Sequence, residues 1–480
     1  MRFLPLYILL ALITTSNNVY ADYTYKEDDT KVIDGKLYAS SGDAVTGIYE
    51  EFYENNIKKS EQPYIDGVLN GLATFYDEQG IKVADVPYVN GIKQGVAIEY
   101  YSNGNMKTKK PYKDGKLDGT YRAYFPNGNV RSRLTYVNDT LDGPAKDYYE
   151  DGKLKRIYNY ASGLKQGPVT KYFNDGSVAQ EYSYTNGEIL GERKSYYKSG
   201  SLKSQVTYIN GKKEGEFKRF FEDGAVESTI PYKDNLAEGI GYFYTPDGNL
   251  NLTVTYKNNV REGEAKAYYP NGNVKLVSNY KNDLKNGIEK EYDEDGVLRL
   301  EMPFVDGLAE GISHEYYENQ NLKMEIPYVK SMAHGIAKFY DIMGNLFAET
   351  IYSNGQKEGE YKEYFEDGKI RLTANYENNL REGLALTYDH DGNLSMETPY
   401  VADNRNGTAK RYYPSGKLMA EIPYEQNVRH GILKIYDENE TLIAKVMFKA
   451  DEIISGYNFD IKGDKTPMTE DELRIINEKF

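Results

Sequence analysis

The sequence predicts an all-β fold, an elongated antiparallel array of β-hairpin repeats with a short C-terminal capping helix, and three observations lead to this prediction. Glycine recurs every 24 residues from Gly47 to Gly431, without an insertion or deletion. The sixth residue of each of the seventeen repeats is aromatic, beginning with Phe52, and so is the eighteenth, beginning with Tyr64. Between these positions each repeat holds two short strand-like runs separated by turn residues.

The N-terminus predicts export. Residues 1–21 resemble a secretory signal peptide, in which Arg2 precedes an apolar run from Phe3 to Ile13 and cleavage follows Ala21. The run is shorter than the about 20 residues of a membrane-spanning helix. We therefore expect an exported protein, periplasmic or extracellular. The chain contains no cysteine, so export brings no disulfides.

Residues 22–46 precede the first repeat glycine and predict a degenerate N-terminal hairpin that caps the array. The turn signal in this segment is Asp34-Gly35, followed by Lys36-Leu37-Tyr38. Because a sheet edge invites pairing with other chains, terminal units of repeat proteins are usually atypical. The seventeen repeats then occupy residues 47–454.

We number the places of each repeat from 1, the recurrent glycine, to 24. The first turn has glycine at place 10 in 14 of the 17 repeats, and four repeats place proline two residues earlier, as in Pro126. This pattern predicts a three-residue hairpin loop with a left-handed residue at place 10. Place 6 then faces place 12, which pairs Tyr148 with Leu154 and Tyr172 with Val178.

Strand alternation from place 6 predicts that places 6, 12, 16 and 18 share one face of the sheet. The aromatic residues of places 6 and 18 then form two structural seams, along which each hairpin packs against its neighbours. The residues of the seams include Tyr100, Tyr124 and Tyr148 at place 6, and Tyr112, Tyr136 and Tyr160 at place 18.

Proline stands at place 17 in eight repeats, as in Pro63, and predicts that the hairpin ladder ends or bulges there. A second turn at pairs such as Asn90-Gly91 returns the chain to the next repeat glycine. At that glycine we expect a positive φ or a close approach to a neighbouring ring. Two strands per repeat give about 34 strands, arranged as one continuous sheet or as a coiled solenoid.

The C-terminal segment 455–480 predicts a linker, at residues 457–467, followed by a capping helix. Thr469 and Glu472 form the sequence pattern of a capping box. The helix carries Leu473, Ile476 and Phe480 on one face, and we expect this face to cover the last strands.

The formal net charge of −15 excludes whole classes of partner. An acidic chain is repelled by phosphate backbones and by anionic lipid surfaces. We therefore expect binding neither to nucleic acid nor to membranes.

The repeat unit, with its paired aromatics, its Tyr-Tyr-x-Asn-Gly-x-Leu turn and its Pro-Tyr-x-Asn-Gly-x-x-x-Gly return, resembles the MORN repeat, specifically the bacterial MORN-variant subtype. The resemblance covers residues 34–448. It implies an elongated antiparallel sheet of hairpins that serves as a scaffold or binding surface, without catalytic residues. Bacterial members are often labelled antitoxins, although a signal peptide separates this chain from cytoplasmic toxins.

No arrangement of residues in the sequence predicts catalysis, a cofactor or a metal site. His334 and His430 occupy the same repeat place four repeats apart, about 38 Å along a sheet with strands ~4.8 Å apart. Acidic turns such as Asp293-Glu294-Asp295-Gly296 and Asp389-His390-Asp391-Gly392 lack the pattern of a calcium loop. We expect neither a catalytic residue nor a metal ligand among them.

Place 7 is the candidate binding position. Strand alternation points it to the face opposite place 6, and a band of aromatic residues there suits a partner, a peptide or a glycan. The alternative is that rings on this face only stiffen a one-layer sheet. The six consecutive aromatic residues at place 7 are Tyr101, Phe125, Tyr149, Phe173, Tyr197 and Phe221.

These observations favour a non-enzymatic exported scaffold that binds a protein or an envelope polymer along its sheet. The alternative function is a secreted, antitoxin-like immunity protein that neutralises an effector. The sequence leaves the identity of the partner and the oligomeric state open.

Overall fold

The computed structural model describes residues 23–480. The predicted signal peptide, residues 1–21, lies outside the described residues. In the described part, 49 strands belong to one sheet, two further strands form a separate hairpin, and one α-helix ends the chain. The prediction of an all-β hairpin array is confirmed. No helix among residues 23–480 is long and apolar enough to cross a membrane.

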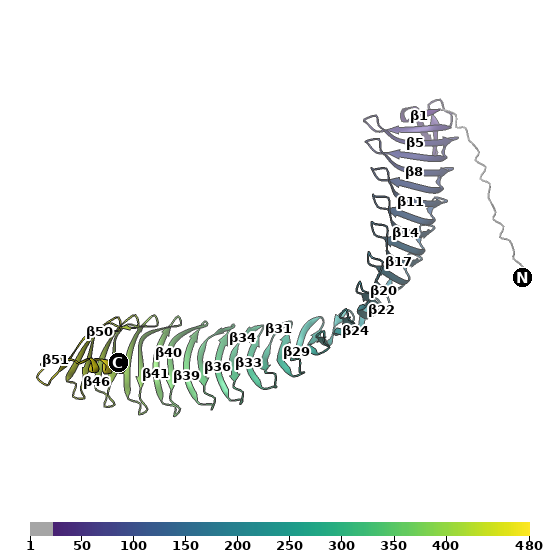
Figure 1. Ribbon diagram of the computed structural model, residues 1–480. Helices are drawn as coiled ribbons and strands as arrows, with labels where there is room; N and C mark the ends of the chain where they lie inside the picture. Colours follow the sequence, from purple (N-terminus) through teal and green to yellow (C-terminus); the bar gives the residue numbers. More distant parts are fainter. Residues whose placement is uncertain (1–22) are drawn as a thin grey trace. The chain divides into compact units, whose positions relative to one another are not determined.

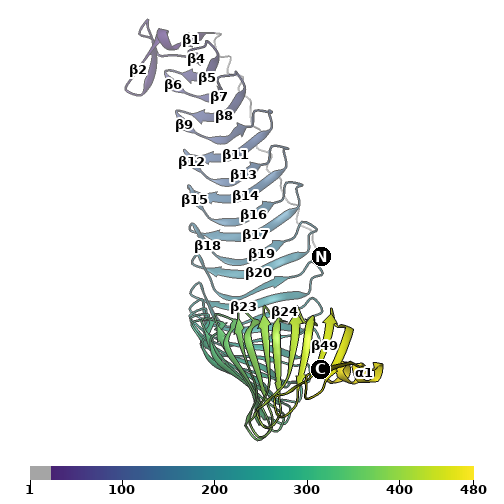
Figure 2. The ribbon, with the colours of Figure 1, turned by 90° about the vertical axis from the view of Figure 1, so that its left-hand side faces the viewer.

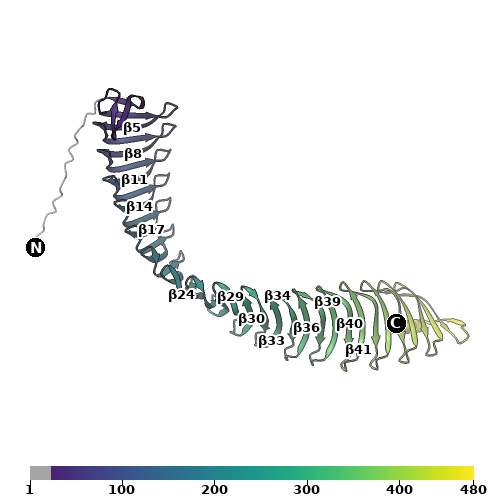
Figure 3. The ribbon, with the colours of Figure 1, turned by 180° about the vertical axis from the view of Figure 1, so that it is seen from behind.

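The chain divides into two units, and each is described by itself. The first comprises residues up to 226 together with 232–235, and the second comprises 227–231 together with 236–480. Successive strands of the first unit lie side by side in Figure 1, and those of the second unit do so in Figure 3.

The repeat that begins at Gly143 illustrates the hairpin. Strand β16 (Gly143–Tyr148) pairs antiparallel with β17 (Leu154–Ala161), and Tyr148 faces Leu154 as predicted. The loop is closed by the Tyr149 N–H, which donates to the Lys153 carbonyl at 2.8 Å. Every residue at place 10 has a positive φ, including the three that are not glycine. The predicted loop type is therefore confirmed.

A β-bulge at place 13 was not predicted, and it changes which residues share a face. Tyr148 pairs with Leu154, but the preceding Asp147 pairs with Arg156, so Lys155 is left as the extra residue. The same register shift between places 5 and 6 recurs in the other repeats whose pairing is described. A bulge re-aims the side chains that follow it.

As a consequence, the prediction that places 6, 12, 16 and 18 share a face is wrong. We call face A the side that carries places 3, 5, 14, 16 and 18, and face B the side that carries places 2, 4, 6, 12 and 15. Tyr158, at place 16, pairs with the buried Ala145 at place 3 and contacts the ring of Tyr160 at place 18. Tyr196, at place 6, instead donates its hydroxyl to Glu181 on face B.

The buried core therefore lies on face A, and the two aromatic seams lie on opposite faces. In the first unit Ala145, Tyr158, Val169 and Tyr182 form one buried cluster that spans two repeats. Rings of successive repeats do not stack along either seam among the described ring contacts. Cations lie over them instead, as Lys93 does over Tyr112 at 5.2 Å.

The return turn is a tight one with positive φ at both central residues, as in Asn90 and Gly91. The residues after it add a third, two-residue strand to most repeats, and Figure 2 shows these strands β9, β12, β15 and β18 along one margin of the first unit. The prediction of two strands per repeat is therefore incomplete. All seventeen repeat glycines have the predicted positive φ.

Proline at place 17 does not end the hairpin ladder. Pro63 pairs with Ile48 inside its hairpin, and its carbonyl accepts from the N–H of Asn70 on the side of the next repeat. Since N–H and C=O of one strand residue point to the same side, the donor that proline lacks also faces the next repeat. The pairing between repeats is interrupted there, since β5 pairs with β7 as far as Glu61 and pairs again, with β6, only from Tyr64. The predicted break thus lies between hairpins and not within them.

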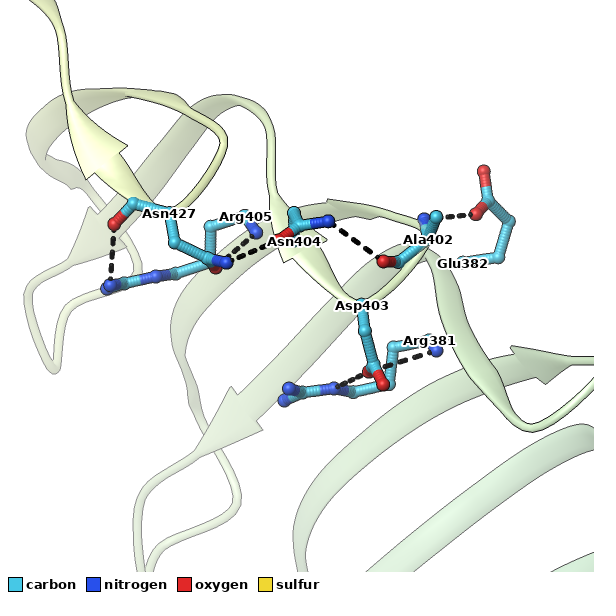
Figure 4. A network of polar contacts seen from close by, with 7 residues as sticks. All are labelled: Arg381, Glu382, Ala402, Asp403, Asn404, Arg405 and Asn427. Carbon is cyan, nitrogen blue, oxygen red and sulfur yellow. Dashed lines mark hydrogen bonds and ion pairs between the residues drawn. The ribbon is translucent and has the colours of Figure 1, made fainter.

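Polar side chains at places 21 and 24 tie each return turn to the preceding repeat. In Figure 4, Glu382 at place 24 accepts from the N–H of Ala402 at 2.8 Å, and Asp403 at place 21 accepts from the N–H and guanidinium of Arg381. Asn427 accepts in the same way from Arg405. Glutamate, glutamine or aspartate at place 24 repeats this contact in most of the array.

The repeats of the first unit consist of opening strands, second strands and short return strands. Their bounds are β4 (Gly47–Phe52), β5 (Lys58–Ile65), β6 (Val68–Leu69), β7 (Gly71–Tyr76), β8 (Lys82–Val89), β9 (Ile92–Lys93), β10 (Gly95–Tyr100), β11 (Met106–Lys113), β12 (Lys116–Leu117), β13 (Gly119–Tyr124), β14 (Val130–Val137), β15 (Thr140–Leu141), β18 (Leu164–Lys165), β19 (Gly167–Tyr172), β20 (Val178–Thr185), β21 (Glu188–Ile189), β22 (Gly191–Tyr196), β23 (Leu202–Ile209) and β24 (Lys212–Phe220), besides β16 and β17.

The second unit continues the same pattern, and in some repeats the return strand merges with the next opening strand. The bounds are β25 (Val226–Lys233), β26 (Leu236–Ala237), β27 (Gly239–Tyr244), β28 (Leu250–Lys257), β29 (Val260–Tyr268), β30 (Val274–Lys281), β31 (Leu284–Lys285), β32 (Gly287–Tyr292), β33 (Leu298–Val305), β34 (Leu308–Ala309), β35 (Gly311–Tyr316), β36 (Leu322–Val329), β37 (Met332–Ala333), β38 (Gly335–Tyr340), β39 (Leu346–Ser353), β40 (Gln356–Tyr364), β41 (Ile370–Glu377), β42 (Leu380–Tyr388), β43 (Leu394–Val401), β44 (Asn404–Arg405), β45 (Gly407–Tyr412), β46 (Leu418–Glu425), β47 (Val428–Arg429), β48 (Gly431–Tyr436) and β49 (Leu442–Lys449).

Both ends of the array are covered. At the N-terminal end β1 (Thr24–Lys26) adds a parallel strand to β4, after which a 3-10 turn (Glu27–Asp29) leads into the hairpin of β2 (Thr30–Ile33) and β3 (Lys36–Ala39). The predicted N-terminal hairpin is therefore present, outside the main sheet.

At the C-terminal end the predicted linker 457–467 is wrong. It belongs largely to β50 (Glu452–Phe459) and β51 (Lys465–Pro467), which extend the sheet. The helix α1 (Glu470–Lys479) has the predicted capping box. Its apolar face packs on the buried cluster of the last repeats, through Leu473, Ile476 and Phe480.

A basic, aromatic groove as candidate functional site

A groove of about 810 Å³ crosses four consecutive repeats of the first unit. Its lining comes from places 5, 7, 13 and 14, together with the place 6 residues of the same strands. The sixteen lining residues are Phe125, Arg131, Ser132, Asp147, Tyr148, Tyr149, Lys155, Arg156, Lys171, Tyr172, Phe173, Ala179, Gln180, Ser195, Tyr196 and Lys203.

The bulge explains how cationic side chains reach this groove. Arg131, Lys155 and Lys203 are all extra residues at place 13, and all three are exposed. Lys155 extends over the ring of Tyr149, with 5.3 Å between its Nζ and the ring centroid. The bulged residues therefore place charge beside the aromatic residues at place 7.

The charge of the groove is opposite to that of the whole chain. Five of its lining residues are cationic, and only Asp147 is acidic. Asp147 accepts from the guanidinium of Arg156, with 2.9 Å between Oδ2 and Nε. No described carboxylate forms an ion pair with the other four cations, Arg131, Lys155, Lys171 and Lys203. The groove therefore carries four uncompensated positive charges.

Lys171 is the most enclosed of these unpaired lysines. It lies at place 5 on face A, half-buried, and contacts the ring of Tyr182 at 5.5 Å. Burial, followed by the charges of Arg193 and Arg156, lowers the pKa of Lys171. A neighbouring anion would offset both effects, so the position favours an anionic ligand.

The place 7 residues divide into those that line the groove and those that do not. Phe125, Tyr149 and Phe173 are brought together in the groove, whereas Tyr101, Tyr197 and Phe221 are not part of its lining. Only half of the predicted binding residues therefore share this site.

Tyrosine at place 7 also has a structural role. Tyr149 donates its hydroxyl to the carbonyl of Tyr172, place 6 of the next repeat, at 2.7 Å. This bond ties one hairpin loop to the next hairpin, as the stiffening alternative expects. The other place 7 tyrosines that make the same bond are Tyr53, Tyr101, Tyr197, Tyr269, Tyr317 and Tyr413.

Aspartate at place 7 closes its own loop. Oδ1 of Asp293 accepts from the backbone N–H groups of Asp295 and Val297, and Asp389 does the same for Asp391 and Asn393. These backbone bonds lower the pKa of both carboxyl groups. The acidic turns are therefore accounted for as loop closures. Among residues 23–480 no group of three acidic, histidine or cysteine side chains is arranged to hold a metal ion.

The cations of the groove were not predicted from the sequence. Place 13 is Lys or Arg in nine of the seventeen repeats, and these include Arg131, Lys155 and Lys203 of the groove. The sequence therefore shows these basic residues, but without knowledge of the bulge their side chains could not be assigned to the same face as place 7.

Comparison with known proteins identifies the repeat. No curated protein matches the chain. Among solved structures, the crystal structure of TcdB2-TccC3-Cdc42 aligns at 12% identity and TM-score 0.14, over 90% of this chain and 28% of that one. The Photorhabdus luminescens Tc holotoxin pore aligns at 11% identity and TM-score 0.14, over 88% and 26%. This chain thus matches only a minor part of either, and such TM-scores show no common overall fold.

The MORN repeat variant matches fourteen segments that together exceed half of the chain. They are residues 45–66, 93–114, 117–138, 141–161, 165–186, 189–210, 213–234, 237–258, 261–282, 285–306, 357–378, 381–402, 405–426 and 429–450. Most of these segments begin two places before a repeat glycine, so they follow the same 24-residue period as the hairpins. The chain belongs to the MORN repeat variant family.

Proposed function

We propose that this protein is an exported, non-enzymatic repeat scaffold that binds a protein or an envelope polymer along its sheet. The observation that carries the proposal is the groove, in which four unpaired cations and aromatic rings from consecutive repeats converge on face A of an acidic chain. A partner that spans several repeats contacts the same set of places in each of them. Such a surface suits a repeating or extended partner better than a compact one.

A binding role agrees with the polar groups of the groove. Its one carboxylate is engaged by Arg156, and its Tyr149 hydroxyl is engaged by a backbone carbonyl. A general acid or base needs a group free to exchange a proton with a substrate. Asp147 and Tyr149 therefore hold the groove in shape, and the groups left unpaired are the cations, which suit an anionic partner.

The binding proposal is tested by affinity capture from the native envelope. The bait is the full mature chain, compared with a groove variant that carries Lys155→Gln, Lys171→Gln and Lys203→Gln. Lys275→Gln is the matched control, because Lys275 also lies at place 13 over a place 7 tyrosine, 5.5 Å from the ring of Tyr269, outside the groove. Material that binds the wild type and the control but not the groove variant supports the proposal. Equal capture by all three contradicts it.

Export is tested separately, on the chain expressed with its own N-terminus. The expected product is found outside the cytoplasm and begins at Asp22, as read by mass spectrometry of its N-terminal peptide. A cytoplasmic product that still begins at Met1 would overturn the export part of the proposal.

A further inference from the structure

The groove has a spacing that restricts what it holds. Two strand separations lie between equivalent places of neighbouring repeats, or about 10 Å at ~4.8 Å per strand. The rings of Phe125, Tyr149 and Phe173 are therefore spread over about 20 Å along the sheet. That length fits a short stretch of linked units and not a single small molecule.

The groove offers no free sheet edge to a peptide. Strands β13, β14, β16, β17, β19 and β20 each pair with another strand on both sides. An extended peptide is usually captured by adding a strand to a free sheet edge. Here only side chains are available, namely ring faces and cationic tips.

Ring faces and cations together match one class of polymer. The apolar C–H faces of pyranose rings pack on aromatic side chains, and carboxylates on the same sugars pair with lysine and arginine. The two lysine tips at the rim, Lys155 and Lys203, lie two repeats apart, and Lys171 lies between them at the floor. The cations are thus spaced for a polymer with separated charges.

Resting on the proposed function, we infer that the groove binds an acidic polysaccharide, a chain of pyranose sugars that carries carboxylates. A nucleic-acid strand places a phosphate at every nucleotide, and the net charge of −15 opposes so dense a polyanion beyond the groove. A chain in which neutral sugars alternate with uronates carries one carboxylate per disaccharide, or about one per 10 Å, which is close to the spacing of neighbouring repeats. Its sugar faces would pack on Tyr149 and Phe173 while its carboxylates pair with the cations.

The test is a titration of the full mature chain with an oligosaccharide of alternating glucuronate and N-acetylglucosamine, followed by calorimetry. Saturable binding is expected, together with a loss of affinity as salt is raised toward 0.5 M, where the Debye length falls to a few ångströms, roughly 4 Å. The triple variant Lys155→Gln, Lys171→Gln, Lys203→Gln should bind at least about tenfold more weakly. Lys275→Gln should bind like the wild type.

Three further variants separate binding from folding. Lys155→Arg with Lys203→Arg keeps the charge and should retain the affinity, while far-UV circular dichroism confirms that each variant keeps its sheet. Phe173→Ser should weaken binding, and Phe365→Ser, at the same place outside the groove, should not. A loss of affinity in the arginine double variant or in Phe365→Ser would contradict the assignment.

The choice of ligand is tested with three competitors: the methyl ester of the same oligosaccharide, polyglutamate and single-stranded DNA. Weaker binding of all three supports the acidic polysaccharide. Equal or tighter binding of polyglutamate or DNA overturns the inference in favour of a protein or a nucleic acid. If the oligosaccharides fail to bind while envelope material is still captured through the groove, the inference is wrong and the proposed function stands. If nothing is captured through the groove, both are wrong.

Discussion

The same repeat places form surfaces of different charge in two regions of the chain. In the groove of the first unit, places 5, 7, 13 and 14 present five cations and one carboxylate. In the second unit a hollow of about 570 Å³ uses the corresponding places, and it presents Arg299 and Lys323 beside Glu291, Glu315 and Glu318. The backbone frame is the same in both regions, so side-chain identity alone decides the charge.

Pairing within the second hollow strengthens this contrast. Lys323 forms an ion pair with Glu315 at 2.5 Å, and Arg299 forms one with Asp293 at 2.7 Å. The groove lysines have no such partners. The comparison teaches that the repeat supplies a fixed frame, whereas the side chains at places 5 and 13 vary and determine the charge that a given stretch presents.

The largest expected effect is the loss of stability when a repeat glycine is replaced by alanine. In the second unit a Cβ added to Gly335 would lie 3.0 Å from Cγ of Pro327, at a φ of +114°, whereas Gly167 in the first unit has a φ of +78° and open space around it. Gly335→Ala should cost about 3 kcal/mol and Gly167→Ala about 1 kcal/mol. Hydrogen exchange of the backbone amides in β38 and β19 measures the local loss of stability in each variant. Equal costs would show that the neighbouring proline ring does not matter.

The next largest effect is a loss of stability at alkaline pH, which comes from tyrosines on face B. Burial, followed by hydrogen bonds to Glu301, Glu325 and Glu349, raises the pKa of Tyr316, Tyr340 and Tyr364 to about 12. Because an unfolded tyrosine ionises near pH ~10, the native state holds protons that the unfolded state releases. This part of the stability is complete below pH ~10 and is lost as the pH rises toward about 12.

Absorbance at 295 nm, recorded with circular dichroism, follows this transition. A variant with phenylalanine at these three positions should lose less stability over the same pH interval. In the groove region Arg133 lies over the ring of Tyr148 at 5.5 Å, whereas Tyr196 donates its hydroxyl to Glu181 as the second-unit tyrosines do to their glutamates. Only Tyr148 therefore marks a difference between the two regions on face B. Ionisation of every phenol near pH ~10 with an intact sheet would contradict the account.

The smallest effect concerns the hydroxyl groups at place 7. Tyr149 and Tyr317 donate to the place 6 carbonyl of the next repeat, at 2.7 and 2.9 Å. Tyr149→Phe and Tyr317→Phe should each cost about 1 kcal/mol, because one carbonyl loses a donor in either region. Local hydrogen exchange in β19 and β38 measures both. A clear difference between the two would mean that the frame is not equivalent in the groove and in the acidic hollow.

Much of the repeat could be predicted from single residues. Glycine at place 10 and the Asn-Gly pairs fix turns through positive φ, and the loop length then fixes the pairing of Tyr148 with Leu154. The bulge could not be predicted in this way, since place 13 varies from lysine and arginine to alanine, valine, phenylalanine and serine, and none of these residues marks a bulge. Because of this one unpaired residue, places 6 and 16 lie on opposite faces of the sheet and not on the same face.

The unpredicted bulge also limited the prediction of the site. Place 7 was singled out because its rings stand out in the sequence, and three of them do line the groove. Lys155 and Lys171 were not singled out, because their convergence depends on the bulge and on the spacing of neighbouring strands. Charges of this kind become a site only when the register is known.

The most direct test of the account is lysine footprinting of the full mature chain with and without a saturating oligosaccharide of alternating glucuronate and N-acetylglucosamine. Acetylation of each lysine, read by mass spectrometry, reports which amines the ligand covers. The account predicts protection of Lys155, Lys171 and Lys203 and unchanged reactivity at Lys275 and Lys323. Protection spread over all five lysines, or confined to the last two, would contradict the claim that unpaired cations on a common frame define the binding site.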